Sequence, residues 1–220
     1  DRKAQPLSEI RLIDLTQSIA GPYCTKLLAD FGADVIKVER PGIGDHARRL
    51  GPFPGDVPHQ EKSGLFLFLN TNKLGITLDI ERQEGRSLFR RLAQQADVVV
   101  EDQAPGALSA MGLGYEHLCR GNPELIMTSI SPFGQTGPYR DFKASLLNVF
   151  MAGCDVNLLP PNSPNLEREP IKIGGLAADY DAGVAAAIAT LMALYGRGLT
   201  GQGQWVDISR QEAAIALERV

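Results

Sequence analysis

The chain has 220 residues, and 44% of them are hydrophobic, which is enough for one large domain with a sizeable core. Its 22 Lys and Arg residues and 26 Asp and Glu residues give a net charge of -4, which argues against a nucleic-acid-binding surface. The three cysteines are widely spaced and contain no CxxC pair. Neither a disulfide framework nor a metal site is therefore expected. Reduced thiols are typical of the cytosol or an organelle matrix, and we expect a cytoplasmic location.

Short apolar segments alternate with helical segments along the chain. We expect strands at residues 10–15, 34–39, 75–80, 97–101, 125–131 and 205–209, and helices at 21–31, at 82–95 and in the alanine-rich segment after residue 177. The fourth strand is almost continuous in valine, which is typical of a strand buried on both faces. This alternation predicts an α/β fold with a parallel sheet between layers of helices.

Two long segments interrupt the alternation. Residues 41–63 are rich in Gly, Pro and charge, and residues 158–170 contain four prolines; long loops of this kind often bind ligands or close over them. Residues 210–220 have a helical pattern without a stop signal, so we expect this chain to be part of a longer protein. The longest apolar stretches are too short for a membrane span, and we expect no membrane contact.

Candidate ligand-binding residues lie near the ends of the predicted strands. The usual phosphate-binding motifs are absent, but ligands of open α/β sheets still bind at the carboxyl ends of the strands. Arg40 follows the second strand and Lys73 precedes the third, and either could neutralise a phosphate; solvated surface charge is the alternative interpretation. Pro105 and Gly106 follow the valine-rich strand and start a short helix, whose N-terminus could bind an anion.

The most informative carboxylates are Asp179 and Asp181, at the entrance of the alanine-rich helix. Either could be a helix cap, whereas an aspartate that faces a thioester could be a nucleophile. Histidine-based catalysis has little support, because His46, His59 and His117 all have the pattern of surface residues and no GxSxG motif occurs.

Several segments, taken together in this order and spacing, resemble one family. The segments are Ile19–Pro22, Phe31–Gly42, Asn72–Lys73 with Thr77–Asp79, Pro105–Leu108, Asn122–Pro123 with Phe133–Pro138, and Thr200–Gln204. From about residue 8 to the end, the chain resembles the class III (CaiB/BaiF-type) coenzyme A transferases.

The resemblance implies a Rossmann-like domain, of which residues 1–220 are the N-terminal part, with the small domain and the C-terminal return outside this chain. It also implies an interlocked homodimer for the complete protein. Asp179, with Gly183 four residues later, matches the family's nucleophile. Arg40 matches a residue near the adenine nucleotide, and Asn72 and Lys73 match a CoA-contacting stretch.

The implied reaction moves CoA from an acyl-CoA to a carboxylic acid through an aspartyl anhydride and an aspartyl-CoA thioester, without a permanently bound cofactor. Three departures argue against formate or oxalate as the acyl group. Ile19 stands where formyl-CoA transferase has glutamine, Ala110 replaces a family arginine, and residues 141–153 lack the common Gly-Tyr-Asp pattern.

Two alternatives remain open. The first is an α-methylacyl-CoA racemase-like enzyme, although residues 141–155 lack the histidine that such relatives use. The second is a non-catalytic CoA-binding module.

Overall fold

The computed structural model describes residues 5–153, 167 and 175–216. In this part of the chain, six strands form one parallel sheet in the order β3-β2-β1-β4-β5-β6. The strands are β1 (Arg11–Leu15), β2 (Asp34–Glu39), β3 (Lys73–Thr77), β4 (Val98–Glu101), β5 (Ile126–Ser131) and β6 (Trp205–Ser209). The predicted parallel α/β fold is confirmed. The strand order reverses direction between β1 and β4, where Rossmann-like sheets bind their ligands.

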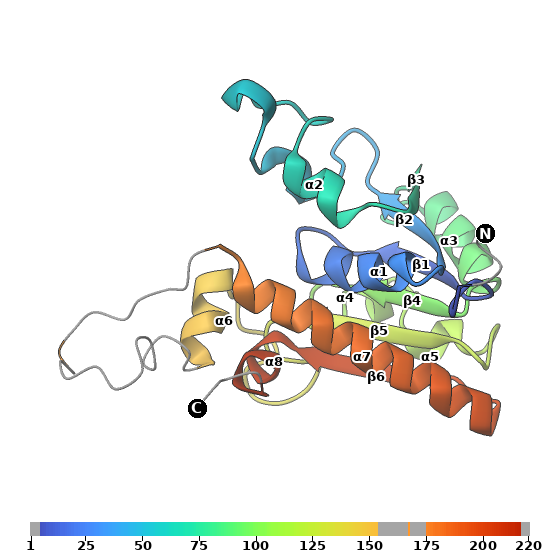
Figure 1. The fold of residues 1–220 in the computed structure, drawn as a ribbon. Helices are drawn as coiled ribbons and strands as arrows, with labels where there is room; N and C mark the ends of the chain where they lie inside the picture. Colours follow the sequence, from blue (N-terminus) through green and yellow to red (C-terminus); the bar gives the residue numbers. More distant parts are fainter. Residues whose placement is uncertain (1–4, 154–166, 168–174, 217–220) are drawn as a thin grey trace.

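Helices cover both faces of the sheet (Figure 1). One face carries α1 (Ala20–Asp30) and α7 (Ala177–Thr200), and the other carries α3 (Gln83–Ala93), α4 (Ala107–Ala110) and α5 (Tyr115–Leu118). The remaining helices, α2 (Gly64–Leu69), α6 (Leu146–Ala152) and α8 (Arg210–Ala216), lie near the carboxyl ends of the strands.

The strands divide their side chains between two hydrophobic cores, as the alternation of a strand requires. Leu12, Val98 and Val100 pack under α1 and α7, whereas Ile13 and Val99 pack under the helices of the other face. Burial on both faces explains the nearly continuous valine of β4.

The third strand is displaced from its prediction, because it runs from Lys73 to Thr77 rather than over residues 75–80. Thr77 pairs with Glu39, the last residue of β2, and the N–H of Leu78 donates to the carbonyl of Glu39. The neighbouring strand therefore offers no partner to residues 79 and 80. Lys73 is the first residue of β3, so it lies at the amino end of the strand and its backbone is away from the ligand-binding edge.

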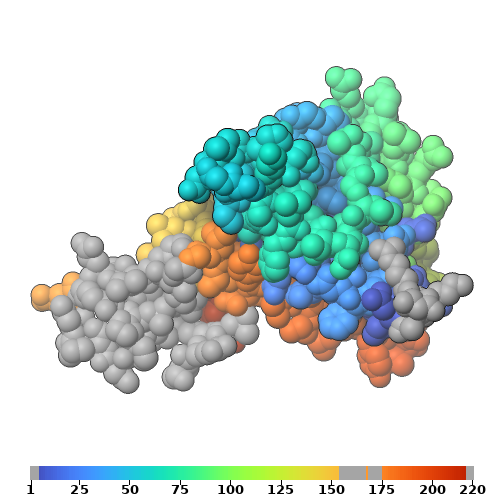
Figure 2. All heavy atoms as spheres, turned by 45° about the horizontal axis from the view of Figure 1, so that its top comes forward, coloured from blue at the N-terminus to red at the C-terminus, as the bar shows by residue number. Residues whose placement is uncertain are grey.

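The long segment 41–63 is folded around two short 3-10 helices, η2 (His46–Arg49) and η3 (Pro54–Asp56). Arg48 holds it to the end of β2, with Nε and Nη2 contacting the Glu39 carboxylate at 2.7 and 2.8 Å. Together with α2 it forms a lobe that protrudes beside the sheet, coloured cyan to teal in Figure 2. The predicted loop 158–170 lies outside the described residues, apart from residue 167.

Helix α7 is long and apolar enough to cross a membrane by length and composition alone, unlike the short stretches that we expected. One such helix is weak support for a membrane span. Ala182, Ala186 and Ala187 of this helix are buried in the core that it shares with α1, as in a core helix of a globular domain.

Candidate active site

The carboxyl ends of β1, β4, β5 and β6 border a cavity of about 610 Å³, which we call the Asp179 cavity. This volume is within the range of about 300–1,000 Å³ that is usual for small-molecule sites. Segments that are far apart in the sequence form its wall: Gln17, Ser18, Ile19, Ala20, His46, Leu50, Asp102, Gln103, Ala104, Ile130, Pro132, Ala144, Ser145, Leu146, Leu176, Asp179 and Arg210.

Asp179 lies in the first turn of α7, and only 6% of its surface is exposed. The N-cap residue is Leu176, so Asp179 lies inside the helix rather than at its cap, where the helix dipole favours a carboxylate. Nη2 of Arg210 contacts Oδ1 of Asp179, and both side chains are mostly buried. Asp181 is half-buried and does not line the Asp179 cavity among the described residues.

Close packing of α7 on α1 positions the turn that carries Asp179. A Cβ atom at Gly183 would lie 2.7 Å from the carbonyl oxygen of Ala20 and 3.1 Å from the ring of Tyr23. Only a glycine lets the two helices approach this closely. This contact holds the first turn of α7 beside the segment that follows β1.

Three aspartate side chains hold that segment through three successive backbone amides. The N–H of Thr16 donates to Asp14 at 3.0 Å, the N–H of Gln17 to Asp102 at 2.7 Å, and the N–H of Ser18 to Asp45 at 2.9 Å. Ser18 has a φ of 65°, which is unusual for a residue other than glycine. Each amide is fixed from a different part of the fold, so the loop is rigidly placed at the wall of the cavity.

A buried cluster of charged side chains lies beneath this loop, in the interior of the fold. Nζ of Lys37 lies 2.6 Å from Asp45 and 3.7 Å from Asp14, and Nζ of Lys73 lies 3.0 Å from Asp14. Burial alone would raise the pKa of Asp14, but the two lysine charges hold it well below its usual value. Burial lowers the pKa of Lys73 to about 8, although the charge of Asp14 opposes this shift. The cluster is a paired internal network, since a buried charge needs a close partner.

Two adjacent acids at the end of β4 have raised pKa values. Burial raises the pKa of Asp102 to about 8, and the charges of Glu101 and Asp14 add to the rise. Burial raises the pKa of Glu101 to about 7, although a hydrogen bond from Ser129 acts to lower it. Asp102 opens on the Asp179 cavity, whereas Glu101 lines a separate cavity on the opposite face of the sheet. Strongly shifted acids in a cavity are typical of functional sites.

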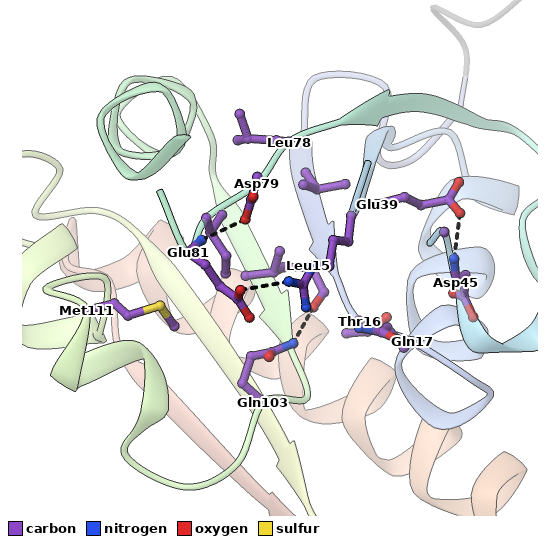
Figure 3. A pocket seen from close by; sticks show the side chains of 14 residues that line it. Leu15, Thr16, Gln17, Glu39, Asp45, Leu78, Asp79, Glu81, Gln103 and Met111 are labelled. Atoms are coloured by element: carbon purple, nitrogen blue, oxygen red, sulfur yellow. Dashed lines mark hydrogen bonds and ion pairs between the residues drawn. The ribbon is translucent and has the colours of Figure 1, made fainter. Parts of the chain in front are cut away.

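A smaller cavity of about 120 Å³, the Arg40 cavity, adjoins the first at the carboxyl ends of β1, β2 and β3. Gln17 and Gln103 line both cavities. Figure 3 shows Asp79, Glu81 and Gln103 grouped around the smaller one, with Gln103 directed toward Leu15. Arg40 lies on its wall, half exposed and paired with Glu81 at 2.8 Å.

The other predicted CoA-contacting residues lie away from these two cavities. Nζ of Lys73 is turned inward and donates to Asp14, to Asn70 and to the carbonyl of Pro22. Asn72 donates to Asp30 at the amino end of β3. Gly106 lines the cavity that holds Glu101, and Pro105 lines none of the cavities named here. From the sequence, Lys73 was grouped with the carboxyl ends of the strands although it precedes its own strand, and Asn72 was implied only by the family resemblance.

Arg210 and the position of His46 at the Asp179 cavity were not predicted from the sequence. Arg210 directly follows β6, just as Arg40 directly follows β2, and this position was the signal that could have identified it. His46 is exposed, as predicted, but it lines the Asp179 cavity. His59 and His117 are exposed and line none of the cavities named here.

Comparison with known sequences identifies relatives of this chain. Residues 7–219 match the model of CoA-transferase family III. The succinyl-CoA–D-citramalate CoA-transferase of Chloroflexus aurantiacus is 42% identical, over 98% of this chain and 52% of that protein. The formyl-CoA:oxalate CoA-transferase of Rhodopseudomonas palustris is 40% identical, over 97% of this chain and 48% of that protein. The chain thus spans about half the length of these relatives.

Solved structures agree with the sequence comparison. A CaiB/BaiF family protein from Brucella suis superposes with a TM-score of 0.87 at 37% identity, covering 97% of this chain and 55% of that one. A protein from Mycobacterium tuberculosis superposes with a TM-score of 0.86 at 33% identity, covering 97% of this chain and 57% of that one. Sequence and fold together lead to one conclusion: the chain belongs to CoA-transferase family III.

Proposed function

We propose that the protein containing this chain transfers coenzyme A from an acyl-CoA to a carboxylic acid, with Asp179 as the nucleophile. The observation that carries the proposal is a buried carboxylate, oriented by Arg210, at a ligand-sized cavity beside the switch point of the sheet. The family and its named CoA-transferases supply the reaction class.

In the first half of the proposed cycle, CoA moves from the donor acid to the enzyme. An oxygen of Asp179 attacks the thioester carbonyl, the C–S bond breaks, and the thiolate of CoA leaves a mixed anhydride. The thiolate then attacks Cγ of Asp179, and the donor acid departs as a carboxylate. An aspartyl-CoA thioester remains.

In the second half, the acceptor carboxylate attacks Cγ of Asp179 and expels the thiolate, which forms a second anhydride. The thiolate attacks the acceptor carbonyl, and the new acyl-CoA leaves the aspartate regenerated. No oxidant, reductant or net proton transfer is needed.

The two adjoining cavities suit the two ends of an acyl-CoA. The Arg40 cavity, of about 120 Å³, would receive only the edge of a nucleotide: Asp79 would accept a hydrogen bond from a hydroxyl or amino group of the adenosine, and Arg40, half exposed beside Glu81, would bind a phosphate. The thioester end would then lie in the Asp179 cavity, past the shared residues Gln17 and Gln103. Lys73 would not bind CoA, since its charge is already paired with Asp14 inside the fold.

The test is Asp179→Asn in the active protein, with Asp181→Asn as the matched control in the same helix. We expect Asp179→Asn to lose at least about 10³-fold in kcat, and the control to stay within a few-fold of the parent. Mass spectrometry after incubation with an acyl-CoA should find CoA on the peptide carrying Asp179, removable by hydroxylamine. Near-parental turnover of Asp179→Asn would refute the assignment.

His46 supports a second candidate, proton transfer at the α-carbon of an acyl-CoA. It lines the same cavity as Asp179, so an acid and a base could lie on two sides of one substrate. Deuterium uptake from heavy water into an acyl-CoA, without any acceptor acid, would establish this reaction instead.

For the complete protein we also propose a homodimer, which rests on the family alone.

A further inference from the structure

Among the described residues that line the Asp179 cavity, Arg210 is the one arginine or lysine, and its contacts are asymmetric. Its Nη2 contacts one oxygen of Asp179, Oδ1. Its Nε is buried and has no hydrogen-bond partner in the described part of the chain. The side chain is 19% exposed, so water replaces few of its missing contacts. A mostly buried guanidinium with an unpartnered Nε–H is suited to stabilise added negative charge.

From this contact, and resting on the function proposed above, we propose that Arg210 is a catalytic residue that holds Oδ1 of Asp179 through the whole cycle and stabilises the negative charge that collects on it. Ile19 lines the same cavity and offers no polar side chain for this task. The assignment concerns one named oxygen of one carboxylate, and this makes it testable.

The chemistry of each step follows from which oxygen Arg210 holds. With Oδ1 held, Oδ2 attacks the thioester carbonyl. When the thiolate attacks Cγ, the C–S bond forms and the electron pair of the carbonyl moves onto Oδ1, beside the guanidinium. The pair then returns, the Cγ–Oδ2 bond breaks, and Oδ2 departs as part of the donor acid. The acceptor carboxylate later supplies a new oxygen in the place of Oδ2, again with charge on Oδ1.

This sequence predicts that the two oxygens of Asp179 have different fates. Oδ2 is replaced at every turnover by an oxygen of the acceptor acid. Oδ1 is retained indefinitely, because the guanidinium prevents the carboxylate group from rotating about the Cβ–Cγ bond between cycles. A carboxylate that rotated freely would exchange both of its oxygens with those of the acceptor acid after a few cycles.

The experiment is multiple turnover of the active protein with an unlabelled acyl-CoA and an acceptor acid carrying ¹⁸O in both carboxylate oxygens. Digestion and mass spectrometry then give the number of heavy oxygens on the peptide with Asp179. For the parent protein we expect one heavy oxygen, however many turnovers are allowed. Two heavy oxygens would overturn the role of Arg210 and leave the proposed function standing, whereas none would overturn the proposed function itself.

Variants connect the retained oxygen to Arg210. Arg210→Gln should lower kcat by about 10²–10³-fold and, given time for the same number of turnovers, should label both oxygens. Arg210→Lys keeps the charge on a single donor group and should recover part of the rate, with partial labelling of the second oxygen. Turnover within twofold of the parent for Arg210→Gln, or a single heavy oxygen in that variant, would overturn the proposal.

Arg197→Gln is the matched control. Arg197 is 14% exposed and pairs with Asp97 at 2.9 Å, near the other end of α7 and outside the Asp179 cavity. This substitution removes a comparable Arg–Asp pair, so the variant should keep single labelling of Asp179 and a near-parental kcat. Loss of single labelling in this control would show that the retained oxygen reflects general stability rather than Arg210, and would overturn the proposal.

Discussion

Asp102 is a carboxyl group that the fold keeps protonated more readily than an ordinary aspartic acid. Burial raises its pKa from 3.8 to about 8, even though it accepts the N–H of Gln17. Between these two pKa values the folded chain binds a proton that the unfolded chain has released. The titration of Asp102 therefore makes the free energy of unfolding fall as the pH rises from about 4 to about 8.

Replacing Asp102 with Asn keeps an oxygen for the N–H of Gln17 but removes the titration. We expect Asp102→Asn to raise the free energy of unfolding by about 1–2 kcal/mol above pH 8. This is less than the full shift implies, because the carboxyl opens on the cavity. Near pH 4 the variant and the parent should agree.

Urea unfolding at several pH values measures this difference. The exposed Glu124, replaced by Gln, is the control and should show no such trend. An unchanged pH profile for Asp102→Asn would contradict the raised pKa.

The sequence predicted single residues best where a motif fixed their neighbours. Asp179, with Gly183 four residues on, could be placed at the start of a helix from the pattern alone. The ion pair between Asp179 and Arg210 could not be predicted, because the two residues meet only when β6 and α7 belong to the same folded sheet. Lys73 is a residue type that often contacts phosphates. Its actual partner, Asp14, is distant in the sequence, so the pattern around Lys73 did not predict the ion pair.

At the scale of elements, the contact between α1 and α7 depends on the absence of one side chain. Gly183 faces the carbonyl of Ala20, whereas Gly198, on the same helix, faces open space. Both are helical positions where alanine has the higher intrinsic propensity. The two substitutions therefore separate packing from propensity.

We expect Gly183→Ala to lower the free energy of unfolding by about 1–3 kcal/mol, since the added methyl group forces α7 away from α1. Gly198→Ala should be neutral or stabilising by up to about 1 kcal/mol. Denaturant unfolding of the two variants gives both values. If Gly183→Ala were as stable as Gly198→Ala, the close approach of the helices would be wrong.

Most strands and long helices could be predicted because their periodicity is local. The shift of β3 arose from a non-local cause, since the end of β2 decides where the ladder stops. Helix α6 was not predicted, and it is a short element of seven residues. Short helices depend on tertiary packing more than on sequence preference.

At the scale of the whole molecule, the outer face of α7 is strongly apolar. Its exposed side chains include Ile188, Met192, Tyr195 and Leu199, and the last three are each about 70% exposed. An apolar surface of this kind marks an interaction site in a folded protein. We expect the proposed homodimer to cover it.

The substitution Ile188→Asp with Met192→Asp should therefore shift the active protein from dimer to monomer in sedimentation velocity, because a buried interface does not accept two unpaired charges. Val57→Asp, at an exposed apolar residue outside α7, is the control and should leave the dimer intact. A dimer that persists in the double variant would show that α7 is covered in another way.

The wall of the Asp179 cavity is drawn from seven places along the chain, and the last of them in the sequence is Arg210, which directly follows β6. During synthesis the ribosome releases the aspartate before the arginine that orients it, and chains begin to fold from their N-terminal side. A nascent polypeptide would thus hold the nucleophile without its cation until β6 docks. Reactivity toward thioesters would therefore rise only after β6 has paired with β5 and brought Arg210 to the aspartate.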